Sequence, residues 1–207
     1  MIFIWGKQTY GAVSKVGNVA VKTMFGHLWY LPLFPMGSYY FVNGSKDAFE
    51  LKQINWRSAF SGYVRVWGPI FALFTLLGFQ GSQQIAGKVL AGMLMTAALA
   101  AVIASYVLDK KYSDKNVDAI RGLMERHFGV AVDPYECASS LEMAINDKMQ
   151  SLTGAPLEQY WYKRTLNDPF SASAPMDLAL LRARCDQHDP ALQELALQKL
   201  QRRATPL

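Results

Sequence analysis

One long stretch of this 207-residue sequence has almost no charge: residues 66 to 108 contain a single charged side chain, Lys88. Acidic residues are absent from that stretch, which excludes the usual aspartate pair of an intramembrane protease and the usual carboxylate proton relay. No run of five or more Lys or Arg occurs anywhere, so binding to nucleic acid is unsupported. Charge is segregated outside the apolar stretch, as a lipid bilayer requires.

Cysteine is also scarce, because only Cys137 and Cys185 occur, far apart in a polar region. We expect reduced thiols rather than a disulfide framework. Cys185 and His188 have the spacing of metal ligands, and His127 or Cys137 would have to complete the ligand set. No paired CxxC or HExxH motif accompanies them, so we predict no metal site. A Cys–His nucleophile is not expected, because Cys185 falls on the apolar face of its predicted helix. GxSxG, P-loop and GxGxxG motifs are absent, so we predict no cofactor and no catalytic residue.

The clearest feature that is present is an apolar segment from residue 89 to residue 108, which contains no charge. Twenty residues at about 1.5 Å each span a hydrocarbon core of about 30 Å, so this segment predicts a transmembrane helix. The alternative is a helix buried in a soluble all-α protein. That protein would need about a hundred further residues of amphipathic helix to cover both apolar cylinders.

A second apolar segment, residues 59 to 79, has a similar length but contains Arg65 and Pro69. We expect its helix to begin near Asn55, whose side chain can cap a helix, and to kink at Pro69. Residues 80 to 84 are polar and turn-prone. The sequence therefore predicts a helical hairpin within residues 55 to 108, with helices at about 57–79 and 86–108.

The residues that flank the hairpin predict its orientation. The loop between the helices contributes Lys88 alone, whereas several basic residues lie on each outer flank, so the positive-inside rule places both termini in the cytoplasm. The expected location is the inner membrane of a bacterium, beside anionic lipid headgroups. Amphipathic rings and snorkelling basic side chains are expected at the interface, namely Trp56, Arg57, Tyr63, Arg65, Trp67, Tyr106, Lys110 and Lys111.

Small residues recur at four-residue spacing in the second predicted helix, a pattern that permits close contact between helices. The expected partner is the first helix of the same chain, and self-association into a homo-oligomer is the alternative. The predicted packing residues are Gly87, Ala91, Ala97, Ala101 and Ser105.

Residues 1 to 54 predict a small antiparallel β module, too small to build much core alone. Short strands are expected at residues 1–5, 12–16, 18–25, 38–42 and 48–54, with turns at Gly17-Asn18 and Asn43-Gly44. The run from Thr23 to Ser45 is uncharged, but Pro32 and Pro35 argue against a third transmembrane helix. A segment that dips into the membrane or lies in its interface remains an alternative. His27 is expected to be structural rather than a ligand or a proton carrier.

An aromatic run leads into Leu-Pro-Leu-Phe-Pro-Met-Gly at residues 31 to 37, downstream of Trp5-Gly6. This segment resembles the N-terminal part of a group of uncharacterised bacterial membrane proteins with two transmembrane helices. It is also similar to small zinc ribbons, in which a Phe-rich, double-proline stretch lies between two CxxC pairs. No cysteine precedes Cys137 here, so the resemblance implies a ribbon without its metal site, and it implies no activity.

Residues 113 to 207 predict an all-α cytoplasmic domain. Apolar residues three and four positions apart predict a first helix that ends at Gly129. A second helix is expected at 135–152. A third is expected from about Ala155 through Leu166. An αα-hairpin follows, with one helix lined by Leu178, Leu181 and Cys185 and the other by Leu192, Leu195, Ala196 and Leu200.

These features together predict a non-enzymatic integral membrane protein that anchors a β module and a helical domain at the cytoplasmic face, where they engage an unidentified protein partner. The alternative is an accessory subunit of a larger membrane transport or secretion complex. A membrane-bound enzyme that acts on lipid or peptide is a third hypothesis, supported only by scattered Asp, His and Cys residues.

Overall fold

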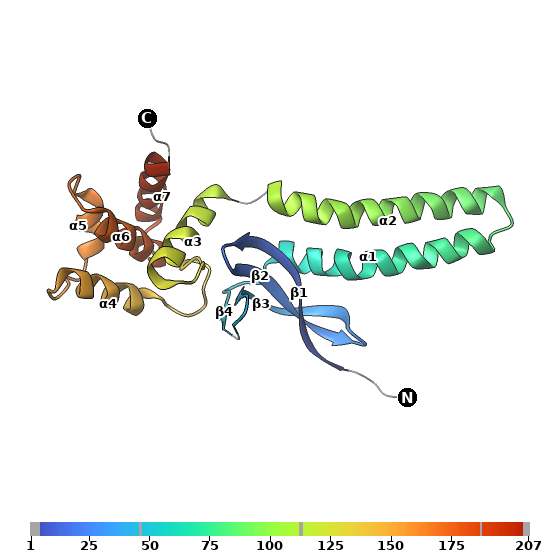
Figure 1. Ribbon diagram of the computed structural model, residues 1–207, viewed down its shortest axis with the longest axis horizontal. Helices are drawn as coiled ribbons and strands as arrows, with labels where there is room; N and C mark the ends of the chain where they lie inside the picture. The colour runs from blue at the N-terminus through green and yellow to red at the C-terminus, as the bar shows by residue number, and fades with distance from the viewer. Residues whose placement is uncertain (1–4, 46, 112–113, 187, 205–207) are drawn as a thin grey trace. The chain divides into compact units, whose positions relative to one another are not determined.

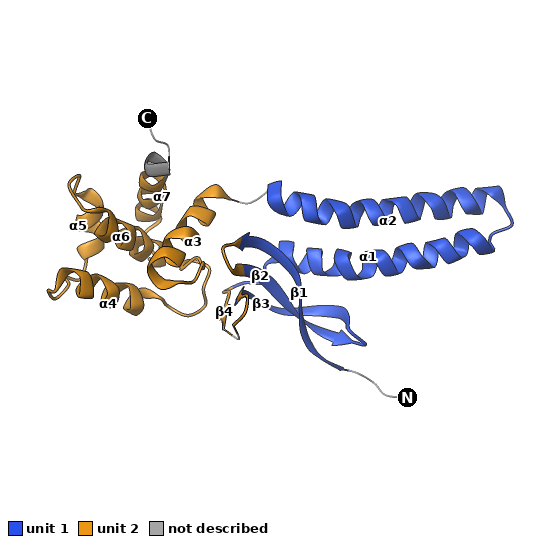
Figure 2. Cartoon of the chain, in the orientation of Figure 1, with its two compact units in different colours: residues 1–15, 20–41, 53–113 blue, residues 16–19, 42–52, 114–207 orange. Residues whose placement is uncertain are grey.

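The computed structural model describes residues 5–45, 47–111, 114–186 and 188–204, with side chains up to residue 200. The chain forms two compact units (Figure 2), of which the first comprises residues 1–15, 20–41 and 53–113, and the second residues 16–19, 42–52 and 114–207. Residues 1 to 54, which the sequence pattern sets apart as one module, therefore contribute to both units. The described residues form four strands and seven helices (Figure 1).

The strands form one antiparallel sheet, as predicted, in the order β1-β2-β3-β4. The sheet has four strands rather than the five expected, because residues 5 and 12–16 belong to one continuous strand, β1. Its turns at Gly17-Asn18 and Asn43-Gly44 are also those expected. Of the first predicted strand, residues 1–4 lie outside the described residues. Since β4 has only three residues, most of β3 has no ladder neighbour on that side, which is why it tolerates two prolines. The strands are β1 (Trp5–Val16), β2 (Val19–Leu28), β3 (Leu31–Val42) and β4 (Ala48–Glu50).

The turn between β2 and β3 consists of Trp29 and Tyr30, and the sequence did not predict it. Both residues have positive φ angles, 51° and 63°, as a two-residue type I′ hairpin turn requires. Such turns are normally built from Asn and Gly, and a bulky residue in this region costs of order 1–3 kcal/mol. The uncharged aromatic stretch is therefore a β-hairpin with a strained tip, and no helix forms within it.

Two long helices, α1 (Trp56–Gly81) and α2 (Ile85–Lys111), form the predicted hairpin (Figure 1). Asn55 caps α1 as expected, because its side-chain oxygen accepts a hydrogen bond from the Ser58 amide at 3.0 Å. The helix continues through Pro69 to Gly81, and residues 82 to 84 make the connecting loop.

A seam in which small residues predominate brings the two helices together. On each helix the buried and half-buried residues of this seam are three and four positions apart in turn. This is the spacing of antiparallel helices packed at a shallow angle. A Cβ atom at Gly68 would lie only 2.5 Å from Cγ2 of Val102, so the helix backbones approach closely there. The seam comprises Ser61, Arg65, Gly68, Ala72 and Thr75 on α1, and Ala91, Met95, Ala98, Val102 and Ser105 on α2.

The sheet packs on the first turns of α1. Gly11 of β1 has a positive φ of 68°, and a Cβ atom there would lie 1.8 Å from the Ser58 carbonyl oxygen, so only glycine permits this approach. The Ser58 hydroxyl donates to the Gly11 carbonyl at 2.7 Å. Beside this contact, the Phe25 ring meets the rings of Tyr10 and Tyr63 edge-on, with centroids 5.7 and 5.0 Å away.

The second unit contains five helices, and α6 lies at its centre. This helix contacts α3, α4, α5 and α7, and its residues from Leu178 to Leu181 are fully buried. A helix enclosed in this way is apolar around most of its surface rather than along one stripe. The helices are α3 (Lys115–Phe128), α4 (Glu142–Thr153), α5 (Trp161–Asn167), α6 (Ser173–Cys185) and α7 (Pro190–Ala204).

The predicted helix from residue 135 is wrong at its start, since α4 begins only at Glu142. The preceding residues pair instead with the end of the β module: Ala138 donates to the Glu50 carbonyl at 2.7 Å, and the Lys52 amide donates to the Glu136 carbonyl at 2.9 Å. These backbone partners are distant in sequence, so periodicity could not reveal them. The expected Gly129 stop is confirmed by its left-handed conformation at the end of α3.

The helix seam is tested by a pair of glycine substitutions on α1. Gly68→Ala places a methyl group against Val102 and should lower the free energy of unfolding by about 1–3 kcal/mol, as overpacking does. Gly78 has no atom within 4 Å of an added Cβ, so Gly78→Ala should be neutral or stabilise by up to about 1 kcal/mol through helix propensity. Thermal unfolding of the full chain in detergent measures both. Equal effects of the two substitutions would contradict the seam.

Candidate functional site

Both long helices expose most of their apolar surface. In the most apolar 18-residue window of each helix, 11% of α1 and none of α2 is buried. A core helix of a soluble protein would be mostly buried. By length and composition, α1 and α2 are therefore able to span a membrane, and their exposed side chains include Phe71, Leu73, Phe74, Leu77, Val89, Leu90, Met93 and Ile103.

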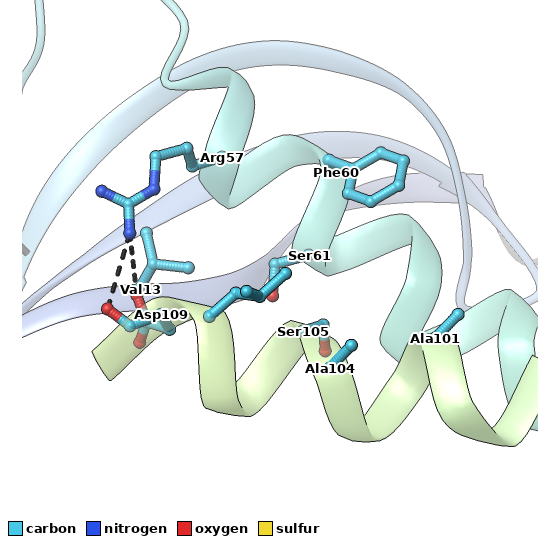
Figure 3. Close-up of a pocket in the computed structure, with 9 residues that line it drawn as sticks. Val13, Arg57, Phe60, Ser61, Ala101, Ala104, Ser105 and Asp109 are labelled. Carbon is cyan, nitrogen blue, oxygen red and sulfur yellow. Dashed lines mark hydrogen bonds and ion pairs between the residues drawn. The ribbon is translucent and has the colours of Figure 1, made fainter. Parts of the chain in front are cut away.

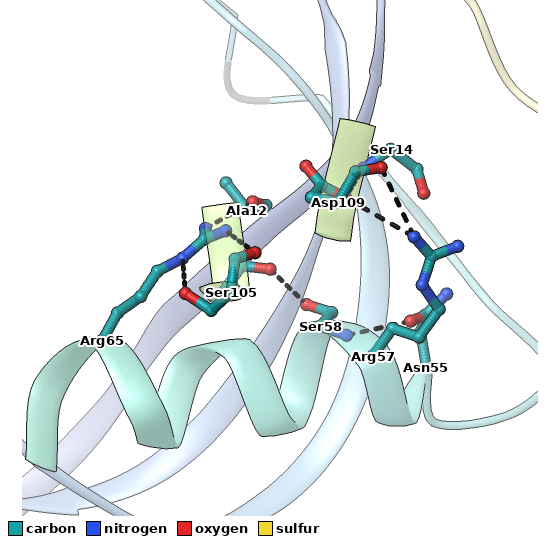
Figure 4. Close-up of polar contacts among 9 residues, drawn as sticks. Ala12, Ser14, Asn55, Arg57, Ser58, Arg65, Ser105 and Asp109 are labelled. Atoms are coloured by element: carbon teal, nitrogen blue, oxygen red, sulfur yellow. Dashed lines mark hydrogen bonds and ion pairs between the residues drawn. The ribbon is translucent and has the colours of Figure 1, made fainter. Parts of the chain in front are cut away.

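Arg65 joins three elements of the first unit near the base of the hairpin (Figure 4). Its guanidinium donates to the Ser105 hydroxyl at 3.2 Å and to the Ser105 carbonyl at 3.0 Å, and a third nitrogen donates to the Ala12 carbonyl of β1 at 2.7 Å. The guanidinium carbon also lies 3.8 Å from the ring centroid of Tyr106. The sequence pattern predicted interface snorkelling for Arg65, and the structure supplies hydrogen-bond partners within the protein.

A second polar contact lies at the end of α2. The guanidinium of Arg57 is 3.8 Å from the carboxylate of Asp109, which also accepts a hydrogen bond from the Ser14 amide at 3.0 Å. The Arg57 side chain is 46% exposed, so this ion pair is screened by solvent and worth about 1 kcal/mol or less. Its main effect is positional, because it places a cation and an anion together beside β1.

Between these two contacts lies an open groove of about 680 Å³ (Figure 3). Small side chains on α2 leave the space, and the bulky Phe60 and Leu108 border it. Arg57 and Asp109 lie together at one end, while Ser61 and Ser105 come from the facing helices (Figure 3). The lining residues are Val13, Arg57, Phe60, Ser61, Ala101, Ala104, Ser105, Leu108 and Asp109.

The predicted aromatic residues of α1 hold the β2–β3 hairpin. Tyr63 donates through its hydroxyl to the Leu33 carbonyl at 2.7 Å, and Trp67 donates through its indole nitrogen to the Pro32 carbonyl at 3.0 Å. The strained turn beside them exposes Trp29 and Tyr30 by 54% and 59%. We call the exposed residues of this hairpin the aromatic tip: Trp29, Tyr30, Leu33, Phe34 and Met36.

The remaining predicted interface residues are also at the base of the hairpin. Trp56 is exposed at the first turn of α1, and Lys110 and Lys111 are exposed in the last turn of α2. Tyr106 lies under the Arg65 guanidinium. The structure therefore gathers these side chains at one end of the two helices, and their position at a membrane surface stays a prediction.

The predicted packing residues divide into two groups. Gly87, Ala91 and Ser105 are half-buried, whereas Ala97 and Ala101 are exposed. A row of residues four apart drifts by about 40° per step around a helix, so strict four-residue spacing leaves the contact seam. Ala101 lines the groove described above, and Ala97 lines a shallow hollow of about 490 Å³ with Gly92, Met93, Thr96 and Ala100.

The second unit brings Cys137, Cys185 and His188 to one cavity of about 240 Å³. Burial raises the pKa of each thiol to about 12, so both are neutral near pH 7 and neither is an activated nucleophile. His27, in the first unit, is buried and stacks on Tyr30, with ring centroids 5.5 Å apart. Nowhere in residues 5–45, 47–111, 114–186 and 188–204 do three His, Cys, Asp or Glu side chains gather as metal ligands would.

The sequence did not predict that residues of β1 and of the ends of α1 and α2 line a groove. Val13, Ser14 and Ser61 carry no motif, and their role depends on how β1 lies across the hairpin. Asp109 did offer a signal, because it is the first acidic residue after the apolar run. Its partner in the structure is Arg57, a base at the start of the other long helix.

Comparisons with models of protein families, with curated proteins and with solved structures find no match to this chain. An antiparallel sheet is present at the N-terminal end, but such a sheet does not by itself identify a zinc ribbon. The resemblance to zinc ribbons and to two-helix bacterial membrane proteins therefore stays a prediction.

The contrast between the two arginines gives a test of the base of the hairpin. Arg65→Ala removes three hydrogen bonds to a charged group and should lower the free energy of unfolding by about 2–4 kcal/mol. Arg57→Ala removes one exposed ion pair and should lower it by about 1 kcal/mol or less. Denaturant titration of the full chain in detergent, followed by circular dichroism, measures both values. An Arg65→Ala loss no larger than that of Arg57→Ala would show that Arg65 does not hold the strand to the helices.

Proposed function

We propose that this chain is a non-enzymatic integral membrane protein that anchors a helical interaction domain to the inner membrane of a bacterium, with both termini in the cytoplasm. The observation that carries the proposal is the exposed apolar surface of α1 and α2. In water that surface would drive aggregation, whereas in lipid it is solvated and the helical backbone satisfies its own hydrogen bonds.

The lengths of the helices support a defined depth in the bilayer. From Tyr63 to the end of α1, and from the start of α2 to Tyr106, the helices measure about 28 and 33 Å at 1.5 Å per residue. Both values match a hydrocarbon core of about 30 Å. Tyr63, Trp67 and Tyr106 then lie at the boundary, where amphipathic rings are favoured. Lys110 and Lys111 lie beyond it, among anionic headgroups.

Arg65 falls at the same depth as these rings, and its contacts explain how a cation is tolerated there. Each of its three nitrogens donates a hydrogen bond, to Ser105 or to Ala12, and its face lies on Tyr106. A guanidinium that is paired within the protein needs less water than a free one. This arrangement supports a boundary position for Arg65 without requiring the side chain to reach far into the headgroup layer.

The aromatic tip lies at the same proposed depth in the bilayer as Arg65. Because Tyr63 and Trp67 donate to the carbonyls of Leu33 and Pro32, the tip cannot be far from the membrane boundary if α1 spans. Exposed Trp and Tyr side chains on an uncharged hairpin favour the interface over bulk water. We therefore propose that the tip rests in the interface as a third point of attachment, without crossing the membrane.

The second unit supplies the surface for a protein partner. It is a helical unit with a buried central helix, and it exposes Phe170, which is 93% exposed, together with Met143 and Leu152. Large apolar side chains in such positions are suited to binding another protein. The partner itself has no signature in these residues, so its identity is left to capture experiments.

Topology is tested with reporters fused after residue 207, before residue 1, and within the loop at residues 82 to 84. The two terminal fusions should report the cytoplasm and the loop fusion the opposite side, since two helices cross the membrane and the uncharged hairpin does not. Alkaline phosphatase activity and green fluorescence measure the two compartments. Terminal reporters on opposite sides would show a third crossing and would overturn the proposed orientation.

The position of the aromatic tip is tested by fluorescence in vesicles of brominated phosphatidylcholine. The full chain with Trp29 as its only tryptophan should be quenched by bromine near the headgroup end of the acyl chain, because Trp29 rests at that depth. Two single-tryptophan controls bracket it: Phe74→Trp on exposed α1 should be quenched more by deeper bromine, and Phe170→Trp on the second unit should not be quenched. Quenching of Trp29 no greater than that of Phe170→Trp, with Phe74→Trp quenched, would place the tip in water.

A further inference from the structure

The groove at the base of the hairpin contains a buried polar group with no partner. Ser61 lines the groove and is 4% exposed, yet among the described residues its hydroxyl has no hydrogen-bond partner. Nearly all buried hydroxyls in proteins are paired. A hydroxyl that is unpaired beside an open groove is therefore a sign of a ligand that carries an acceptor.

The remaining lining describes the rest of that ligand. Phe60, Ala101, Ala104 and Leu108 make an apolar channel, and its volume of about 680 Å³ is in the range of small-molecule sites. At one end Arg57 is 46% exposed, and a guanidinium has five donors, so it can bind a further anion while it stays beside Asp109. Because Asp109 offsets the charge of Arg57, preference for an anion depends also on the exposed Lys110 and Lys111.

We propose that the groove binds one diacyl phospholipid of the surrounding membrane, and this inference rests on the proposed membrane location. One acyl chain lies along Ala101, Ala104 and Leu108, and its ester carbonyl accepts the hydrogen bond that Ser61 otherwise lacks. The phosphate lies at Arg57, with the lysines nearby. Ester groups of a bilayer occur at the boundary between headgroups and hydrocarbon, which is the depth that Tyr63 and Tyr106 assign to this part of the helices.

Two features favour a lipid over a helix from another protein. Val13 of β1 and the large Phe60 take up part of the groove's lining, so a flexible chain enters more easily than a helix about 10 Å wide. The charged side chains of Arg57 and Asp109 also lie together at one end of the channel, and Ala101 lies at the other (Figure 3). An amphiphile has this same division between an apolar chain and a polar head.

The test is native mass spectrometry of the full chain in detergent, titrated with phosphatidylglycerol. We expect one lipid retained per wild-type chain. Ala104→Leu fills the channel and should weaken retention about tenfold or more, whereas the matched Ala86→Leu, on an exposed position outside the groove, should leave it unchanged. Ser61→Ala, which keeps the channel open, should weaken retention several-fold. Thermal unfolding of each variant shows whether it is folded. If Ala104→Leu does not fold, lipid retention by Ser61→Ala decides whether the site exists.

Other ligands give distinct results in the same experiment. Retention of palmitate as strongly as phosphatidylglycerol would show that a single acyl chain with a carboxylate suffices and would overturn the assignment to a diacyl phospholipid. Equal lipid retention by wild type, Ala104→Leu and Ser61→Ala would overturn the site. Loss of a dimer instead of a lipid in Ala104→Leu would show that a second copy fills the groove. Because binding is measured in detergent, its failure is separate from a failure of the topology reporters.

Discussion

The close contact between Gly11 of β1 and the Ser58 backbone of α1 is the constraint on which the first unit depends. No side chain larger than hydrogen fits at Gly11, and the strand therefore lies against the helix itself. From this contact follow the reach of Arg65 to Ala12, the bond from the Ser14 amide to Asp109, and the place of Val13 in the lining of the groove. A larger residue at Gly11 would move the strand away and disconnect all three.

The same contact explains why one end of the hairpin is polar and the other apolar. The sheet covers only the early turns of α1, so hydrogen-bonding groups are concentrated there and the remainder of both helices exposes large apolar side chains. In a bilayer this gradient sets the depth of insertion, because rings and paired cations are stable at the boundary and bare hydrocarbon side chains are stable inside. The Trp29-Tyr30 turn exposes two further aromatic rings, which the proposed topology places at that boundary.

The second unit depends on different contacts, which involve buried charge. Asp133 is fully buried and receives two hydrogen bonds from Arg184 at 3.1 and 2.9 Å. Arg121, also buried, donates to the Ala131 and Val19 carbonyls. Removal of Asp133 or of Arg184 alone would leave the other as a desolvated charge, which is strongly unfavourable. The unit therefore requires residues 16–19 and 42–52 of the N-terminal region, and it is not made by the C-terminal sequence alone.

Local rules were sufficient for the elements of this protein that are regular. Apolar length predicted both long helices, Asn55 predicted the cap of α1, and Gly129 predicted the end of α3, because each depends on a few neighbouring residues. The turn at Trp29-Tyr30, the late start of α4 and the place of Ser61 in the groove depend on segments far away in sequence, so composition and periodicity did not reveal them. What the sequence by itself determined is the position of the two long apolar helices and the antiparallel strands at the N-terminal end. Only the tertiary structure decided which side chains meet at the base of the hairpin, because those contacts arise from the approach of backbones at Gly11 and Gly68.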